Sequence, residues 1–207
     1  MNVLLINGSP HPRGCTFTAL SEIARTLTAE GVESEIFHIG NRPIRGCMAC
    51  GKCKDTGLCV FTEDSVNEGI ARFNAADGVV VGSPVYYAAP NGAVCAFLDR
   101  VFFLKAHPYA LKPAASIVSC RRGGASAAFD RLNKYFTISQ MPIVSSQYWN
   151  AVHGNTPEEV QKDLEGLQIM RTLARNMAWM LKCIEQAKGH VPLPEREASI
   201  ATNFIRD

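Results

Sequence analysis

Short apolar-rich runs alternate along the chain with longer segments in which apolar residues recur every three or four positions. Wholly apolar runs such as 3–6 and 78–81 are typical of strands buried on both faces, and the longer spacing is typical of amphipathic helices. The runs predict strands at 3–6, 33–39, 78–81, 114–118 and 142–144. The periodic segments predict helices at 16–30, 64–73, 92–104 and 126–138.

A long last helix is predicted over residues 157–188. Thr156 is a candidate N-cap, with Pro157 at the first helical position and Glu159 three residues after the cap, which is an N-terminal signature. At about 1.5 Å per residue this helix would be about 45 Å long, so its end is expected to pack on a second subunit. The tail from Gly189 has no clear period and is expected to wrap the body or a partner.

The order of elements predicts an α/β fold with a five-stranded parallel sheet and helices on both faces. Residues 1–207 are expected to form a single domain, with a cysteine-rich insertion after the second strand (46–60) and a C-terminal helix and tail (157–207). In such a sheet, ligands bind beyond the carboxyl ends of the strands. The loops that follow the strands are therefore the candidate site.

Composition narrows the functional classes. The 207 residues suffice for one α/β domain with a substantial core. A net charge of +2 gives no reason to expect nucleic acid or an anionic membrane as a partner. The start of the chain lacks the basic segment and long apolar segment of a signal peptide, and no stretch reaches membrane-spanning length, so we expect a cytoplasmic protein.

The loop after the first predicted strand, Gly8 to Thr16, leads directly into a helix. Free backbone N–H groups at a helix N-terminus favour a phosphate group. Ser9, Thr16 and Thr18 add hydroxyl donors, and Arg13 adds a positive charge. This combination indicates a phosphate-binding loop, although an ordinary turn between strand and helix also uses glycine and proline.

Two common nucleotide-binding loops do not match this segment. The dinucleotide fingerprint needs a second glycine two residues after the first, where Pro10 stands here. The Walker loop ends in Gly-Lys-Ser/Thr, but this loop ends in Gly14-Cys15-Thr16. A loop that holds one terminal phosphate monoester, as in FMN, remains.

Two motifs carry a family resemblance: LLINGSPHPRGCT at 4–16 and GSPVYYAAPNGAVCAFLDRVF at 82–102. From residue 1 to about 185 the chain resembles the NAD(P)H-dependent FMN reductase and iron–sulfur flavoprotein group of flavodoxin-like proteins. The resemblance implies that the FMN phosphate binds at Ser9, Arg13, Cys15 and Thr16. The family often has Asn-Thr where this chain has Cys15-Thr16, so the contact made by that first side chain differs.

The second loop follows the strand at 78–81 and contains Pro84, Val85, Tyr86 and Tyr87. It is expected beside the phosphate loop, where backbone groups could meet the polar edge of a flavin and an aromatic ring could cover its face. The resemblance implies that the isoalloxazine lies against these four residues. One of the two tyrosines is expected to be a half-buried packing residue instead.

The third loop, after the strand at 114–118, contains Cys120, Arg121, Arg122 and Gly123, which we include among the expected cofactor-binding residues. The glycines permit close approach of the backbone to a ligand. One arginine could stabilise the reduced flavin electrostatically and the other could bind a nicotinamide-nucleotide phosphate. A solvated surface charge is the alternative for either arginine.

Four cysteines lie within thirteen residues, with the spacing C-x2-C-x2-C-x5-C: Cys47, Cys50, Cys53 and Cys59. Three cysteines at successive three-residue steps are close to the ferredoxin run that wraps a cubane cluster. Structural zinc sites usually use two Cys-x-x-Cys pairs separated by a longer stretch. The resemblance implies a [4Fe-4S] cluster; zinc, or a loop of free thiols, remains an alternative.

These observations predict an FMN-dependent oxidoreductase. NAD(P)H, as a cosubstrate, or another reduced donor would supply electrons, and the acceptor would be a quinone, an azo or nitro compound, a flavin or a protein. A [4Fe-4S] cluster would relay electrons, and no side chain need act as a nucleophile. The alternative is a non-catalytic electron carrier fed by ferredoxin. The long last helix favours a homodimer or homotetramer.

Overall fold

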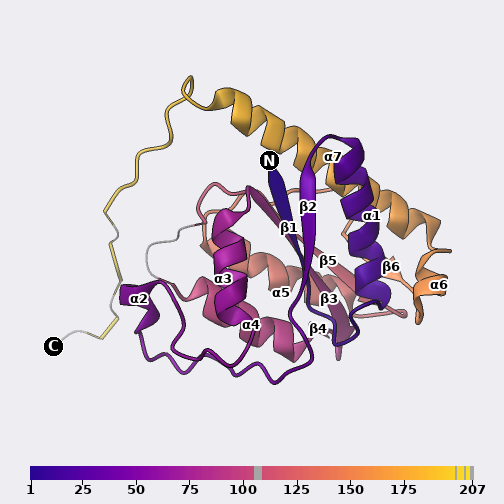
Figure 1. Cartoon of the computed structure of the whole chain (residues 1–207), viewed down its shortest axis with the longest axis horizontal. Coiled ribbons are helices and arrows are strands. Elements are labelled where there is room, and N and C mark those ends of the chain that lie inside the picture. Colours follow the sequence, from indigo (N-terminus) through magenta and orange to yellow (C-terminus); the bar gives the residue numbers. More distant parts are fainter. Residues whose placement is uncertain (105–108, 199, 203, 206–207) are drawn as a thin grey trace.

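The computed structural model describes residues 1–104, 109–198, 200–202 and 204–205. Its described strands form one sheet with five parallel strands in the order β2-β1-β3-β5-β6 (Figure 1). A short sixth strand, β4, pairs antiparallel with the end of β3. The predicted five-stranded parallel sheet is confirmed. The bounds are Asn2–Asn7 (β1), Glu33–His38 (β2), Gly78–Tyr86 (β3), Ala89–Pro90 (β4), Ala114–Cys120 (β5) and Ala151–His153 (β6).

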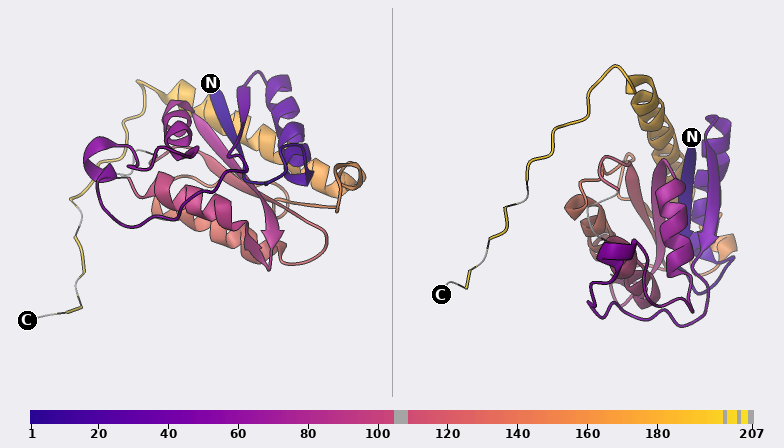
Figure 2. Two further views of the ribbon diagram at one scale, coloured as in Figure 1. Left: turned by 60° about the horizontal axis from the view of Figure 1, so that its bottom comes forward. Right: turned by 60° about the vertical axis from the view of Figure 1, so that its left-hand side comes forward.

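Helices cover both faces of the sheet, as Figure 2 shows in side view. One face carries α1 (Cys15–Ala29) and α7 (Leu164–Ala187), and the other carries α3 (Val66–Ala75), α4 (Gly92–Phe102) and α5 (Ala125–Ile138). Two short helices, α2 (Cys53–Thr56) and α6 (Pro157–Val160), lie in connecting segments. None of the described helices is long and apolar enough to cross a bilayer.

The predicted last strand at 142–144 is wrong. The fifth parallel strand is β6, Ala151–His153, and residue Ile143 makes only an isolated bridge to Ala114. Asn150 explains the placement of β6, because its side chain donates to Ser116 O at 3.0 Å while its carbonyl accepts from the Val118 N–H at 2.9 Å. These bonds join residues more than thirty positions apart, so the local pattern did not reveal them.

The single helix predicted over 157–188 is wrong in its middle. Thr156 caps its start as predicted, accepting from Glu159 N at 3.3 Å. The helix then breaks after α6, because the Asp163 carboxylate accepts from Gly166 N at 2.9 Å and His153 N at 2.6 Å and so starts α7 as a new helix. The described part of the tail runs away from the body rather than around it (Figures 1 and 2).

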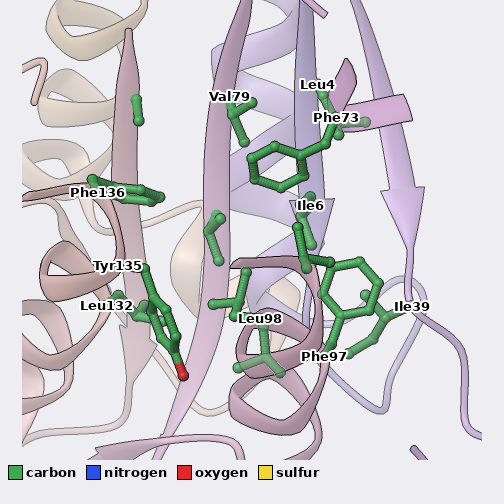
Figure 3. Packing of buried hydrophobic residues seen from close by; sticks show 14 of the residues in the cluster. Leu4, Ile6, Ile39, Phe73, Val79, Phe97, Leu98, Leu132, Tyr135 and Phe136 are labelled. Atoms are coloured by element: carbon green, nitrogen blue, oxygen red, sulfur yellow. The ribbon is translucent and has the colours of Figure 1, made fainter. Parts of the chain in front are cut away.

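Two apolar layers hold the helices on the sheet. The layer under α1 and α7 is largely aliphatic, whereas the layer under α3, α4 and α5 is rich in aromatic rings (Figure 3). In the aromatic layer Phe102 links both ends of the cluster, with ring centroids 5.5 Å from Phe73 and 6.2 Å from Phe136. This packing holds α4 in place against the sheet.

Phe136→Ala is expected to destabilise the protein by about 3–5 kcal/mol, because it removes a fully buried ring and leaves a cavity beneath α5. Urea unfolding followed by far-UV circular dichroism measures the change. Ile138→Ala, in the same helix but 74% exposed, is the matched control and should change stability by less than about 0.5 kcal/mol. Equal effects of the two substitutions would contradict the placement of Phe136 in the core.

Candidate functional site

Four loops at the carboxyl edge of the sheet enclose a pocket of about 710 Å³. They are the loops after β1, β3, β5 and β6. β1 leads to α1 on one face and β3 leads to α4 on the other, so the pocket lies at the topological switch point where α/β folds bind ligands. The lining residues are Ser9, His11, Pro12, Arg13, Gly14, Cys15, Thr16, Pro84, Val85, Tyr86, Ser119, Cys120, Arg121, Gly154, Asn155, Thr156 and Pro157.

The β1–α1 loop is held rigidly against the sheet. Ser9 is buried, its Oγ accepts from His11 N at 3.1 Å, and its carbonyl contacts His38 Nε2 at 2.8 Å. A Cβ on Gly8 would lie 2.7 Å from the Val94 Cβ, so the close approach of this loop to α4 requires glycine. The loop is therefore preorganised around the pocket.

The start of α1 faces the pocket without a side-chain cap. Gly14 is the N-cap residue, and no side chain accepts a hydrogen bond from the first turn. The N–H groups of a first helical turn have no partner within the helix, and the helix dipole adds a partial positive charge. Exposed Arg13 supplies a full positive charge beside them. This end of the pocket suits an anion.

Cys15 and Thr16 join α1 to the neighbouring loops. The Thr16 Oγ1 lies 2.9 Å from Ser119 Oγ near the end of β5, and the Cys15 thiol donates to the Gly154 carbonyl at 3.8 Å. Burial raises the pKa of the Cys15 thiol above its ordinary value, so the thiol is neutral at pH 7. It adds no negative charge next to the uncapped start of α1, and it contacts the loop after β6.

The β3–β4 hairpin forms one wall of the pocket. Pro84, Val85 and Tyr86 line it, whereas Tyr87 is fully exposed at the tip and is not among the lining residues. Tyr87 and Ala88 form a two-residue turn in which both φ angles are positive, at 51° and 60°. Hairpins with this geometry usually place Asn or Gly at both positions, because other residues are strained there.

The double substitution Tyr87→Asn and Ala88→Gly is expected to stabilise the protein by about 1 kcal/mol, since it supplies residues that adopt positive φ readily. Thermal unfolding of the flavin-free protein measures the gain. Ala89→Gly, one residue into β4, is the control and should be destabilising because glycine weakens a strand. A loss of stability in the double variant would show that the Tyr87 ring makes a stabilising contact.

The third loop contributes less than predicted to the pocket. Cys120 and Arg121 line it, while Arg122 and Gly123 are exposed and lie outside its lining. Burial raises the pKa of the Cys120 thiol, which is 6% exposed, so it also stays neutral. Nine of the twelve predicted cofactor-binding residues therefore surround one pocket, and Tyr87, Arg122 and Gly123 do not.

The segment from Gly154 to Pro157 also lines the pocket, although it is not among the predicted cofactor-binding residues. It follows β6, whose predicted position was several residues too early in the chain. Because ligands bind beyond strand ends, a correct placement of the last strand would have pointed to this segment. A Cβ on Gly154 would lie 2.8 Å from Val160 N, so the tight connection to α6 requires glycine.

The four clustered cysteines line a second, small pocket of about 20 Å³ next to the end of α4. The other lining residues are Met48, Gly51, Val60, Phe61, Arg100 and Phe103, so the walls are mainly apolar. Within the described residues, no group of three or more His, Cys, Asp or Glu side chains is arranged to hold a single metal ion. The thiols share a pocket without converging on one ion position.

The two pockets lie at opposite ends of α4. The N-cap residue Asn91 donates its backbone N–H to Ser83 Oγ, 2.9 Å away, beside the larger pocket, and Phe103 follows the last turn at the cysteine pocket. The eleven residues of α4 correspond to about 16 Å. The cysteine segment leaves the carboxyl edge of the sheet after β2 and runs to the far end of α4, as α2 shows in Figure 1.

A helix start that suits an anion and a pocket at the switch point of a parallel α/β sheet are the features that place the chain in a class of proteins. The sequence profile of the NADPH-dependent FMN reductase family matches residues 1–156, and the chain belongs to this family. Family membership supports an FMN-dependent oxidoreductase.

Two similar proteins of known description are iron–sulfur flavoproteins. An iron–sulfur flavoprotein of Archaeoglobus fulgidus is 33% identical over 191 residues, covering 86% of this chain and 94% of its own. One of Methanocaldococcus jannaschii is 28% identical over 195 residues, covering 90% of this chain and 100% of its own.

Solved structures of low sequence identity share the fold. RosB with bound 8-demethyl-8-formylriboflavin-5'-phosphate superimposes with a TM-score of 0.70 at 13% identity, covering 100% of this chain and 94% of its own. A WrbA-like flavodoxin from Agrobacterium tumefaciens gives a TM-score of 0.59 at 16% identity, covering 88% and 96%.

Proposed function

We propose that the protein is an FMN-dependent oxidoreductase that takes electrons from NAD(P)H and passes them to a quinone, an azo or nitro compound, a flavin or a protein acceptor, with a [4Fe-4S] cluster at the four cysteines. The observation that carries the proposal is the pocket of about 710 Å³ with the free start of α1 and Arg13 at one end. Its volume is in the range of small-molecule cofactor sites.

The residues around this pocket fit FMN. The phosphate would bind at the first turn of α1 with Ser9, Arg13 and Thr16, and the ring system would lie along Pro84 to Tyr86. Arg121 would stand near the ring, where a positive charge favours the reduced, anionic flavin. Bound FMN supplies the redox chemistry, because it accepts a pair of electrons and releases them singly; the protein binds, orients and tunes it.

The donor set of the cysteine pocket supports a thiolate-bound metal centre. Its polar donors are four thiols and a buried guanidinium, and no carboxylate or imidazole lines it. Soft thiolate donors select iron–sulfur clusters or zinc.

The separation of the pockets supports an oligomer. The two sites of one chain lie at opposite ends of α4, which is about 16 Å long, so a partner chain that places its cluster nearer to the flavin would shorten the electron path. A homodimer or homotetramer is therefore part of the proposal.

Anaerobic mixing of purified, FMN-loaded protein with NADH or NADPH tests the function. Rapid loss of the flavin absorbance near its long-wavelength maximum, followed by reoxidation when a quinone is added, is the expected result. No bleaching with either nucleotide, in protein that dithionite reduces fully, would overturn the nicotinamide-dependent activity.

A second candidate function is an electron carrier fed by ferredoxin. Cys47 and Cys50 are exposed at the rim of the cysteine pocket, so a cluster there would be accessible to a one-electron protein partner. In that case reduced ferredoxin would reduce the flavin while NAD(P)H would not. The same stopped-flow mixing, with ferredoxin in place of the nucleotide, separates the two functions.

A further inference from the structure

Arg100 is a buried cation at the cysteine pocket. Its side chain is only 1% exposed, and it lies in the last turn of α4. It forms an ion pair with the Asp64 carboxylate, whose side chain is 6% exposed. Burying two charges is costly, and a pair of apolar residues often serves stability as well. The burial of this pair therefore calls for an explanation beyond packing.

The guanidinium contacts both ends of the cysteine loop. Its Nη1 donates to the carbonyl of Arg45, two residues before Cys47, at 3.2 Å. Its Nη2 donates to the carbonyl of Phe61, two residues after Cys59, at 3.2 Å. Asp64 accepts from both of these nitrogens. The planar fork of an arginine suits such a bridge between several acceptors, whereas a lysine offers a point charge.

The remaining N–H group points at a predicted metal ligand. Arg100 Nε donates to the Cys59 Sγ at 3.2 Å. The backbone of Cys59 is also fixed, because its N–H donates to Asn67 Oδ1 at 2.8 Å and its carbonyl accepts from Asn67 Nδ2 at 2.9 Å. Arg100 of α4 thus holds the Cys59 sulfur, and Asn67 of α3 holds the Cys59 backbone.

We propose that Arg100 is the positioning residue of the four-cysteine site: it closes the loop by joining its two ends, and it tunes the bound centre through the N–H donated to Cys59. The second part rests on the proposed cluster. Hydrogen bonds to cluster sulfurs raise the reduction potential, because they stabilise the more negative, reduced form. Neighbours that hold metal ligands in this way typically change metal affinity by about 10- to 100-fold when removed.

Two variants separate the charge from the hydrogen bonds. Arg100→Lys keeps the positive charge but cannot reach both carbonyls and the sulfur together. The double variant Arg100→Gln with Asp64→Asn removes both charges, so neither is left buried without its partner. Arg131→Gln is the matched control, since Arg131 is partly exposed on α5 and contacts Asp99 and Tyr135 rather than the cysteines.

The readouts are iron and sulfide content, the reduction potential from an electron paramagnetic resonance titration, and amide hydrogen exchange of residues 46–60 in metal-free protein. FMN content reports that each variant is folded. We expect both Arg100 variants to lower the reduction equilibrium constant about tenfold, which is about 59 mV for a one-electron couple. We also expect faster exchange of the loop, with wild-type behaviour in Arg131→Gln.

A potential and an exchange rate that Arg100→Lys leaves at the wild-type values would overturn the proposal, because charge alone would then suffice. If wild-type protein binds FMN but takes up no iron or sulfide, the cluster is wrong, and the tuning role fails with it. The loop-closing role is then judged by exchange in the metal-free chain: unchanged exchange in the double variant overturns it, and faster exchange supports it.

Discussion

Cys50→Ser is expected to remove iron and sulfide from the protein while FMN stays bound. Serine keeps the size of the side chain but replaces a soft thiolate with a hydroxyl, which is a poor ligand for iron at pH 7. Cys50 lines the cysteine pocket and none of the larger pocket, so the FMN site should be unaffected. Colorimetric iron and sulfide analysis, together with the absorption spectrum of anaerobically purified protein, measures the outcome.

The control for this experiment is Cys183→Ser. Cys183 is an exposed cysteine in α7, outside the cysteine pocket, so its replacement should leave both metal and flavin contents at wild-type levels. Iron retained at the wild-type ratio in Cys50→Ser would contradict a four-cysteine cluster. Zinc in the wild type, lost in the same variant, would instead favour the zinc alternative.

Arg13→Glu is expected to weaken FMN binding by about 10- to 100-fold and to leave riboflavin binding almost unchanged. A charge-assisted contact contributes about 1.5–3 kcal/mol, and each 1.4 kcal/mol corresponds to a factor of ten. Arg13 is exposed at the pocket, so the charge reversal should not disturb the core. Riboflavin lacks the phosphate, so the difference between the two ligands isolates the phosphate contact. Quenching of flavin fluorescence measures both affinities.

Arg42→Glu provides the matched charge reversal. Arg42 is exposed in the segment after β2 and does not line the larger pocket, so this variant should bind FMN nearly as the wild type does. If Arg13→Glu weakened riboflavin as much as FMN, the phosphate would not lie at the start of α1. If the charge reversal acted only through the overall electrostatic field, FMN affinity would fall in both Arg13→Glu and Arg42→Glu.

The four sheet-forming apolar runs up to residue 118 predicted β1, β2, β3 and β5 because each is recognisable within a few residues. The strand–loop–helix order then located three of the loops around the larger pocket, since parallel strands end at one edge. The start of α6 was equally local, as Thr156 and Pro157 form a cap signature. Whether the predicted residues bind FMN, and whether the cysteines bind a cluster, remains a prediction.

Local pattern was insufficient wherever residues distant in the sequence decide the structure. Asn150 fixes β6 through its bonds to Ser116 and Val118. Asp163 ends the helical run partly because its carboxylate accepts the N–H of His153 in β6. The loop from Gly154 lines the pocket because it follows β6, whose position depends on these distant contacts.

The sequence by itself determined the alternation of strands and helices, the glycine- and hydroxyl-rich loop before α1 and the spacing of four cysteines, because each of these depends on neighbours along the chain. Only the tertiary structure decided what surrounds them. It brought Arg100 to Asp64 across 36 positions, and placed that ion pair against Cys59. It also put the cysteines at the far end of α4 from the larger pocket. These contacts depend on how helices pack on the sheet, and packing joins residues that no local window contains together.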